Sequence, residues 1–368
     1  MSEPTHPPPQ FGTFTGVFTP TLLTIMGVIL YVRMGWVVGN AGLGGAMLIL
    51  GLGILITTCT GLALSSIATN TRIGHGGPYA ILNKSLGLEV GGSVGIPLFL
   101  TRPLGVAMYI IGFREGLLWV LPDWPAMAID LGVFAVLFGI AFKSADLAFK
   151  TQYLIMAVIV ASLVSIFGAP KLWSDPLPVT WWGSYPGSPE DGFSGADFWV
   201  VFAVFFPATT GILAGANMSG DLKDPRRAIP RGTLAAIAIS TVIYFAVAWV
   251  AASTGDLGTL ARNYNHLIDE SLFPPLVLAG LLGATASSAL AGLVGGPRIL
   301  MAMGRNRIVP FSEQMAQTKK GEPRNAILVT GVLTLAAIMV RDLNAIAPLV
   351  TMFFLITYGM INVVVLLE

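Results

Sequence analysis

The chain has 368 residues, of which 54% are hydrophobic and only 11% are charged. Soluble globular domains carry roughly a quarter charged residues, so the composition argues against a large water-soluble enzyme. The formal net charge of +1 argues against a nucleic-acid surface, which needs clustered Lys and Arg. The chain is therefore expected to lie in a membrane.

Residues 1–15 are polar and rich in proline, and we expect a disordered cytoplasmic tail there without a cleaved signal. About ten apolar segments follow, each long enough to cross a hydrocarbon core of roughly 30 Å as a helix. In chain order they are Gly16–Val37, Ala46–Ala68, Val90–Val120, Met127–Phe142, Ala148–Phe167, Phe198–Gly220, Ala228–Ser253, Phe273–Met303, Asn325–Val340 and Ala345–Leu367. The predicted fold is an all-α polytopic membrane protein with one transmembrane domain at 16–367.

The distribution of Lys and Arg favours a cytoplasmic N-terminus in the cell membrane, since short cytoplasmic loops retain basic residues. With this orientation, the outer loops hold only Lys171, Arg262 and Arg341. Residues 170–196 become an extracellular loop, which we interpret as a linker rather than a folded cap. The chain ends within an apolar run, Ile361–Leu367, as expected of a chain truncated before further helices.

The first and sixth segments carry helix breakers where a spanning helix should be most regular. Thr19–Leu30 and Phe206–Gly215 both place Pro, then Thr, then Gly, then branched apolar residues. Unwound chain in lipid persists only where protein, water or a ligand satisfies its backbone. The matched positions predict a five-plus-five inverted repeat, 16–169 and 197–367, with discontinuous helices 1 and 6. Helices that are merely kinked for packing are the alternative.

These breaks predict sites for ions of both signs. Half-helices that begin at Gly27–Ile29 and Gly211–Leu213 present free N–H groups and positive dipole ends, which suit anions. Half-helices that end near Leu23–Ile25 and Pro207–Ala208 leave carbonyl oxygens that suit Na⁺ or K⁺. The sequence thus indicates a secondary transporter with its site near the bilayer midplane.

From Gly16 to Leu367 the chain resembles the cation-chloride cotransporters, a branch of the amino acid–polyamine–organocation superfamily. The stretches that carry the resemblance are Gly27–Arg33, Ala107–Phe113, Phe202–Leu222 and Ala284–Leu290, with Phe205–Asn217 the most specific part. The chain departs from many sodium-potassium-chloride members at Thr24, where they have Asn, and at Met26, where they have Trp. The glycine motif of amino acid permeases is missing from the first segment.

The resemblance implies the following sites. The potassium site would use Thr24, Ile25, Tyr109, Pro207 and Thr210. The sodium site would use Leu23, Met26, Ala284, Ser287 and Ser288. Chloride would be held by Gly27, Val28 and Ile29, and lower down by Gly211, Ile212, Leu213 and Tyr358. Arg33 and Glu115 would form an extracellular gate.

The implied function is electroneutral symport of chloride with K⁺ and Na⁺ by alternating access. The alternatives are a potassium-chloride or sodium-chloride symporter, an amino acid permease, and a membrane scaffold or regulatory subunit that transports nothing. His6, His75 and His266 are scattered over the tail and loops, without the spacing of a transition-metal site or a nucleophile–base pair, so we expect no enzyme. The expected partners are the transported ions, the lipid bilayer and, as one option, a second copy in a homodimer; no cofactor and no nucleic acid are expected.

Overall fold

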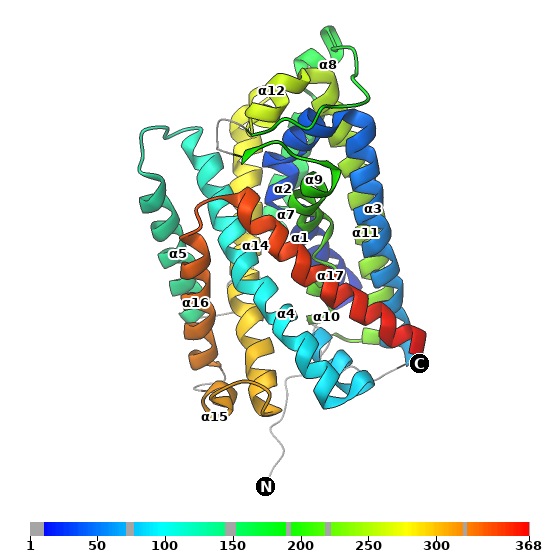
Figure 1. The fold of residues 1–368 in the computed structure, drawn as a ribbon, viewed down its shortest axis with the longest axis vertical. Helices are drawn as coiled ribbons and strands as arrows, with labels where there is room; N and C mark the ends of the chain where they lie inside the picture. The colour runs from blue at the N-terminus through cyan, green and yellow to red at the C-terminus, as the bar shows by residue number, and fades with distance from the viewer. Residues whose placement is uncertain are drawn as a thin grey trace.

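The computed structural model describes residues 11–70, 77–143, 152–188, 193–217, 222–318 and 322–367. Within these ranges, nine helices are long and apolar enough to cross a membrane. The shorter apolar helix α16, Arg324–Ile338, occupies the place of the ninth predicted segment. The predicted all-α polytopic fold is therefore confirmed (Figure 1).

The elements follow one another as the apolar pattern predicts. Up to the long loop they are η1 (Phe14–Phe18), α1 (Thr19–Ile25), α2 (Val28–Val32), α3 (Met34–Asn70), α4 (Gly77–Leu118), α5 (Ala126–Lys143) and α7 (Gln152–Phe167). The loop holds α8 (Pro170–Ser174), β1 (Gly187–Ser188) and β2 (Phe193–Ser194). After it come α9 (Phe198–Phe205), η3 (Phe206–Thr209), α10 (Leu213–Asn217), α11 (Pro225–Thr254), α12 (Leu257–Arg262), α13 (His266–Asp269), α14 (Pro274–Arg305), α15 (Ser312–Ala316), α16 and α17 (Leu343–Leu367).

Two glycines turn the chain inside its long helices. Gly42 in α3 and Gly87 in α4 have φ of 70° and 79°, a left-handed conformation that glycine adopts without steric cost. The predicted first and second segments therefore meet inside α3, on the two sides of Gly42.

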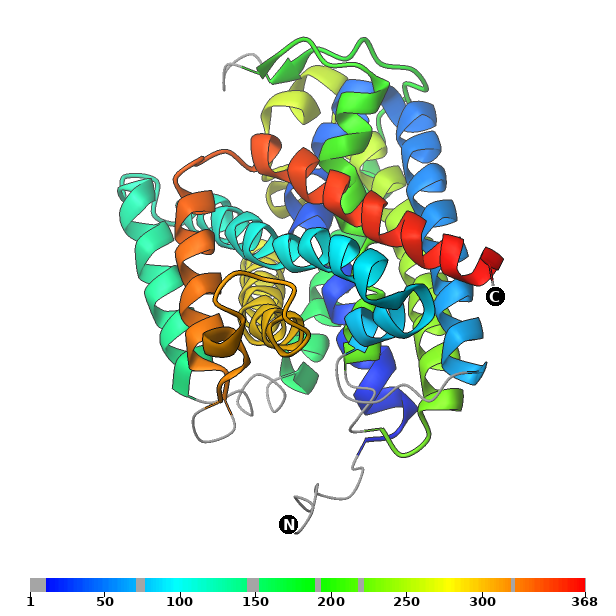
Figure 2. The same ribbon diagram turned by 60° about the horizontal axis from the view of Figure 1, so that its bottom comes forward.

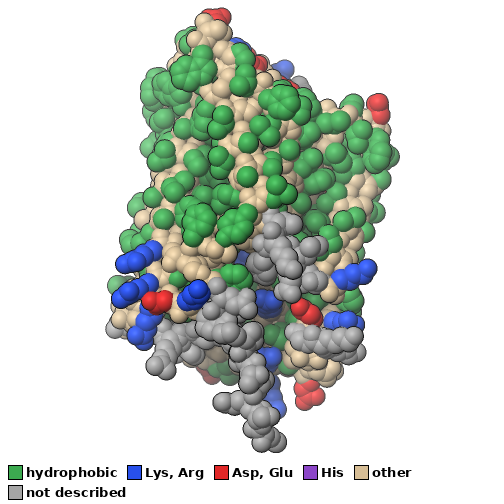
Figure 3. All heavy atoms as spheres, turned by 180° about the vertical axis from the view of Figure 1, so that it is seen from behind, with side chains coloured by type: hydrophobic (Ala, Val, Ile, Leu, Met, Phe, Trp, Pro, Cys, Tyr) green, Lys and Arg blue, Asp and Glu red, His purple; other side chains and the backbone are tan. Residues whose placement is uncertain are grey.

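The outer surface of the bundle is apolar, as expected of helices solvated by lipid. Figure 3 shows hydrophobic side chains over most of one face, with Lys and Arg gathered at the end that carries α15 in Figure 1. Side chains that point outward from separate helices include Leu55, Val136, Val160, Val242, Val332 and Met352. We call the end that carries α8 and α12 in Figure 1 the upper end and the end that carries α15 the lower end.

The interrupted helices lie at the centre of the bundle. In α1 and α2 nearly every side chain is buried, and α3 packs along α11 while α14 packs along α4. α17 crosses α4, and α5 lies beside α16 at one edge (Figures 1 and 2). The centre of the molecule is thus lined by α1, α4, α9 to α10, α14 and α17.

The described parts of the long loop, 170–188 and 193–196, pack on α3 rather than form a plain linker, which corrects our interpretation of this segment. Its backbone bonds to both sides of the Gly42 turn: the Leu43 N–H donates to the Thr180 carbonyl at 3.0 Å and the Gly183 N–H to the Ala41 carbonyl at 2.9 Å. The β1 and β2 strands pair antiparallel beyond this contact. The described part of the loop therefore covers the upper end of α3.

Candidate functional site

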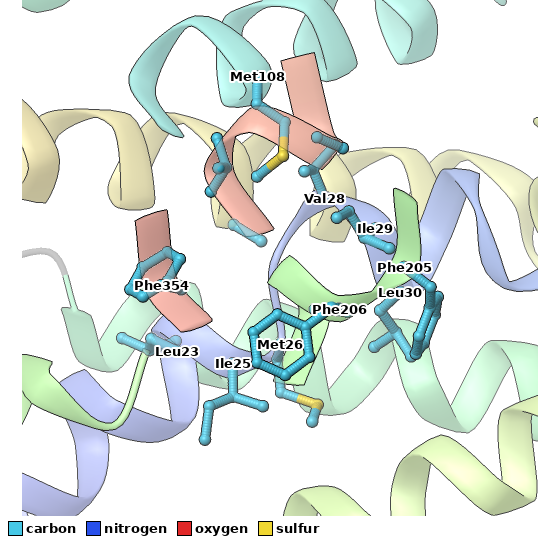
Figure 4. Close-up of a cluster of buried hydrophobic side chains, with 14 of the residues drawn as sticks. Leu23, Ile25, Met26, Val28, Ile29, Leu30, Met108, Phe205, Phe206 and Phe354 are labelled. Carbon is cyan, nitrogen blue, oxygen red and sulfur yellow. The ribbon is translucent and has the colours of Figure 1, made fainter. Parts of the chain in front are cut away.

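The first break lies where the sequence predicts it. α1 ends at Ile25, Met26 leaves the helical region with ψ of 43°, and Gly27 is extended before α2 begins at Val28. The Gly27 N–H donates to the Ile25 carbonyl at 2.7 Å. Apolar side chains from the surrounding helices enclose this unwound segment (Figure 4).

The second break touches the first. Thr210 is extended after η3, and Gly211 has φ of 107°. A Cβ atom at Gly211 would lie 2.8 Å from Cγ2 of Thr24 and 3.3 Å from the Ile25 nitrogen. Only glycine fits this crossing, both for its backbone conformation and for its lack of a side chain. The unwound parts of helices 1 and 6 therefore meet at the centre of the bundle.

A tyrosine that the sequence analysis missed joins the two breaks. The hydroxyl of Tyr244, on α11, lies 2.7 Å from the Ile25 carbonyl and 3.0 Å from the Ala208 carbonyl. It thereby satisfies carbonyl groups that unwinding leaves without a helical donor. The Ile25 oxygen, a predicted potassium ligand, accepts hydrogen bonds from Tyr244 and Gly27 in this conformation. Nothing local in the sequence distinguishes Tyr244 from an interfacial aromatic residue.

A cavity of about 140 Å³ adjoins the breaks. Its lining combines many of the predicted ion ligands with residues from α4 and α14. The predicted ligands that line it are Leu23, Thr24, Tyr109, Pro207, Thr210, Gly211, Ser287 and Ser288. The predicted ligands outside its lining are Ile25, Met26, Gly27, Val28, Ile29, Ile212, Leu213, Ala284 and Tyr358. The tertiary structure thus gathers the predicted cation ligands more completely than the chloride ligands.

The cavity hydroxyls keep the capacity to bind cations. Thr24 Oγ1 donates to the Pro20 carbonyl and Thr210 Oγ1 to the Pro207 carbonyl, each at 2.7 Å. Because each hydroxyl donates its hydrogen to a carbonyl, the lone pairs of the hydroxyl oxygen stay available to a cation. Tyr109 lies against the same break, with ring carbon Cε1 3.5 Å from the position of a Cβ on Gly27.

The predicted chloride donors around α2 are tightly packed. Val28 is 1% exposed, and a Cβ on Gly112 of α4 would collide with its side chain. Tyr358 on α17 is fully buried, its ring 6.4 Å from that of Phe206, and its hydroxyl has no hydrogen-bond partner.

The upper end above the breaks is closed by Arg33. Its guanidinium makes a bidentate ion pair with Glu115, with Nη1–Oε2 at 2.7 Å and Nη2–Oε1 at 2.9 Å. Nε donates to Asn344 Oδ1 at 2.8 Å, and the Tyr264 ring lies 3.7 Å below the guanidinium carbon. The predicted pairing of Arg33 with Glu115 is present. Asn344 of α17 and Tyr264, just before α13, make further contacts with the Arg33 guanidinium.

The lower end of the cavity is the open one. Ala291, near the middle of α14, and Arg298, about two turns closer to its lower end, line the cavity and are exposed. Arg33, in contrast, is 1% exposed. The structure is therefore accessible from the lower end and closed at the upper end.

Two arginines in the cavity lining, Arg102 and Arg298, escaped the sequence analysis. The signal for Arg102 was available: it is a charge within the apolar segment Val90–Val120, and charges in membrane helices are functional by default. A further buried pair, Arg114 with Asp130 at 2.6 Å, links α4 to α5 away from the cavity.

Of the histidines, His266 is buried at the upper end within hydrogen-bond distance of Thr254, at 3.0 Å. His6 and His75 lie outside the described residues. Among the residues that the structure describes, no three His, Cys, Asp or Glu side chains form a metal-binding group.

The amino acid permease family matches residues 16–367 of the chain. Solute carrier family 12 member 2 from Squalus acanthias is 35% identical over 96% of this chain, and the same carrier from Mus musculus is 34% identical over 96%. Solute carrier family 12 member 1 from Homo sapiens is 34% identical over 96%. The match spans only 34% to 37% of the length of these relatives.

Proposed function

The chain belongs to the amino acid permease family, in its branch of cation-chloride cotransporters, and from this premise we propose that it carries chloride together with K⁺ and Na⁺ across the cell membrane. The observation that carries the proposal is the crossing of the two unwound helices at Thr24 and Gly211, beside a cavity lined by hydroxyl and carbonyl groups. Unwound chain inside a membrane domain is maintained where it serves a ligand.

For K⁺ we propose a site formed by Thr24, Tyr109, Pro207 and Thr210, completed by the Ile25 carbonyl. All but Ile25 line the cavity. A hard cation without a preferred geometry is held by several neutral oxygens, which these hydroxyl and carbonyl groups supply. The Ile25 carbonyl accepts a hydrogen bond from the Tyr244 hydroxyl, and it would become a K⁺ ligand if it bound the cation beside that hydrogen bond.

For Na⁺ we propose a site between α1 and α14, from Leu23, Ser287 and Ser288 with the buried Met26 and Ala284 carbonyls. The two serines and Leu23 all line the cavity. Two adjacent hydroxyl groups supply close oxygen ligands for a small cation.

For Cl⁻ we propose the N–H groups at Gly27, Val28 and Ile29 above the break, and those at Gly211, Ile212 and Leu213 with Tyr358 below it. Support comes from the start of α2 at Val28 and of α10 at Leu213, where the first N–H groups have no acceptor one turn earlier in the helix. The Gly27 N–H, which donates to the Ile25 carbonyl in this conformation, would have to exchange that bond for chloride. The balance of one Na⁺, one K⁺ and two Cl⁻ would make the cycle electroneutral.

We propose that the lower end faces the cytoplasm, so that the structure is inward-open and the Arg33–Glu115 pair acts as the extracellular gate. The gathering of Lys and Arg at the lower end supports this orientation (Figure 3). Alternating access would follow from rocking of one helix group against the other about the fixed site.

The test is uptake of ⁸⁶Rb⁺ into liposomes that hold the purified protein, with external chloride or gluconate and with or without Na⁺. Chloride-dependent uptake that Na⁺ stimulates supports the proposal. Uptake that needs chloride but not Na⁺ indicates a potassium-chloride symporter, and chloride-dependent ²²Na⁺ uptake without K⁺ indicates a sodium-chloride symporter. Amino acid uptake without rubidium uptake indicates a permease, and no flux of any kind indicates a scaffold.

Two substitutions assign the cation sites. Tyr109→Phe removes the phenol oxygen and should raise the KM for Rb⁺ with little effect on that for Na⁺, whereas Ser288→Ala should do the reverse. Tyr185→Phe and Ser271→Ala make the same chemical changes at the upper end, outside the cavity lining, and should leave both values unchanged. Equal effects of Tyr109→Phe and Tyr185→Phe would refute the assignment of the potassium site.

A further inference from the structure

Arg102 lines the cavity from the middle of the membrane-spanning part of α4, Gly87–Leu118. It lies seven residues before Tyr109, about two helical turns away on the same face. Gly105, between them, also lines the cavity and leaves the space between the two side chains open. The stem of Arg102 packs on α14, where a Cβ on Gly296 would lie 3.0 Å from the Arg102 Cβ.

The charge of Arg102 has no protein counter-ion in the part of the chain that the structure describes. Its Nε and Nη2 atoms are buried and have no hydrogen-bond partner. Arg33 and Arg114, in contrast, each pair with a carboxylate. Since an arginine stays protonated in proteins, Arg102 cannot relieve the cost of burial by losing its charge. A bound anion would compensate that cost.

The groups near Arg102 are hydrogen-bond donors rather than acids. Its electrostatic neighbours are the hydroxyl groups of Tyr109 and Tyr358. The Tyr358 hydroxyl is fully buried and faces the backbone N–H of Gly211, and its own hydrogen has no acceptor in the described residues. The described cavity lining contains no Asp or Glu. Guanidinium N–H groups with two phenol O–H groups form a donor set that suits an anion.

We propose that Arg102 is a ligand of an anion site in the cavity, together with the hydroxyl group of Tyr109, in the lining, and that of Tyr358, beside the lining residue Gly211. The site takes a small monovalent anion, either chloride or the carboxylate group of a small organic acid. This inference rests on the proposed function and deepens it. A cation beside Tyr109 is repelled by the guanidinium until an anion neutralises it, so the anion binds first and cation affinity depends on it.

The experiment measures anion-dependent thermal stabilisation of the purified full chain in detergent. Sodium chloride and sodium acetate are titrated against sodium gluconate at constant ionic strength, in the wild type, Arg102→Gln, Tyr358→Phe and Arg305→Gln. Arg305 is an exposed arginine at the end of α14, outside the described cavity lining. Loss of a charged hydrogen-bond partner should weaken anion binding by about tenfold or more in Arg102→Gln. Arg305→Gln should bind the anion as the wild type does.

The outcomes separate this inference from the transport proposal. If chloride stabilises the wild type and Arg102→Gln with equal affinity, and chloride-dependent ⁸⁶Rb⁺ uptake persists with an unchanged KM for chloride, Arg102 is not a ligand although transport stands. Stabilisation by acetate but not chloride supports the anion site and overturns chloride transport. No stabilisation of the wild type by either anion overturns the site.

A second comparison keeps the inference testable if Arg102→Gln does not fold. Arg102→Lys keeps the charge without the planar fork, and Tyr358→Phe removes one donor. Each should weaken anion binding by several-fold, about threefold to tenfold. Anion affinities equal to that of the wild type in both variants would overturn the inference.

Discussion

At Arg33 a guanidinium with 1% of its side chain exposed meets a carboxylate, an amide oxygen and an aromatic face. A charge this deeply buried is tolerated because each guanidinium donor has an acceptor. The free energy of unfolding therefore depends on both Arg33 and Glu115 staying in place. The sequence predicted the pairing of Arg33 with Glu115, whereas only the tertiary structure shows that Asn344 and Tyr264 contact Arg33.

We therefore predict that Glu115→Gln lowers the free energy of unfolding by about 3 kcal/mol, because it leaves the Arg33 charge unpaired. Arg33→Gln combined with Glu115→Gln should recover a large part of this loss. Thermal unfolding of the single and double variants in detergent measures the coupling. Asp224→Asn, which breaks the exposed pair with Arg227, should have almost no effect. Additive losses in the Arg33 and Glu115 double variant would contradict the prediction.

His266 gives the upper end a dependence on pH. Burial lowers the pKa of His266 below its ordinary value of 6.5 because a charged imidazole would lose its hydration, although the nearby Glu270 and Asp269 oppose this shift. The folded state thus prefers neutral His266. Its contribution to stability is complete above the unfolded pKa and is lost as the pH falls toward the folded pKa.

We predict that the melting temperature of the wild type falls between pH 7 and pH 5, and that His266→Gln reduces this slope. The loss per pH unit in the sensitive range is up to about 1.4 kcal/mol. Asp256, whose pKa is lowered below 3.8 by hydrogen bonds from Thr259, titrates below this range. Identical slopes for the wild type and His266→Gln would show that the histidine does not control the effect.

At the scale of elements, the unwound centres of helices 1 and 6 exist because proline and glycine interrupt apolar segments and because each break supports the other. Gly211 is the point of closest approach, with its positive φ and with Thr24 in the space that a side chain would need. A helix that merely bends would need neither feature. The crossing therefore favours a site over a packing kink.

Gly211→Ala should disrupt this crossing. Backbone strain alone costs about 1 to 3 kcal/mol, and displacement of Thr24 should add to it, so ⁸⁶Rb⁺ uptake should fall by at least about tenfold. Gly359→Ala is the matched control, since a Cβ at Gly359 of α17 meets nothing within 4 Å. Uptake by Gly211→Ala at the wild-type rate would show that the crossing tolerates a side chain and is not part of the transport site.

At the scale of the whole molecule, the upper end is closed by Arg33 and the cavity is open below, as the proposed alternating-access cycle requires of one of its states. This asymmetry predicts chemical access from one side. In a Cys59→Ser background, Ala291→Cys should react faster with a membrane-impermeant thiol reagent from the lower side than from the upper side. If the inward-open state is favoured by about 1.4 kcal/mol, the rates from the two sides should differ about tenfold.

Ser174→Cys, in the exposed α8 of the loop, is the matched control and should react only from the upper side. Both rates can be measured in liposomes by adding the reagent outside or trapping it inside. Faster modification of Ala291→Cys from the upper side would mean that the upper end opens more often than the structure indicates.

Much of this fold is determined by the sequence alone, because the signals are local. The length and apolar composition of each segment define the membrane spans. Pro207 and Gly211 interrupt the sixth helix whatever its neighbours are. The same local logic located the first break at Gly27. The proposed order of the five-helix repeats and of the ion sites stays a prediction from that pattern and from family resemblance.

Only the tertiary structure decided which side chains from distant helices meet. It placed the Tyr244 hydroxyl on the Ile25 carbonyl, bonded the long loop to the Gly42 turn, and left Arg102 in the cavity without a carboxylate. Those outcomes depend on how helices far apart in the chain cross one another. A linear pattern reports which face of a helix is apolar, but not which partner will cover it.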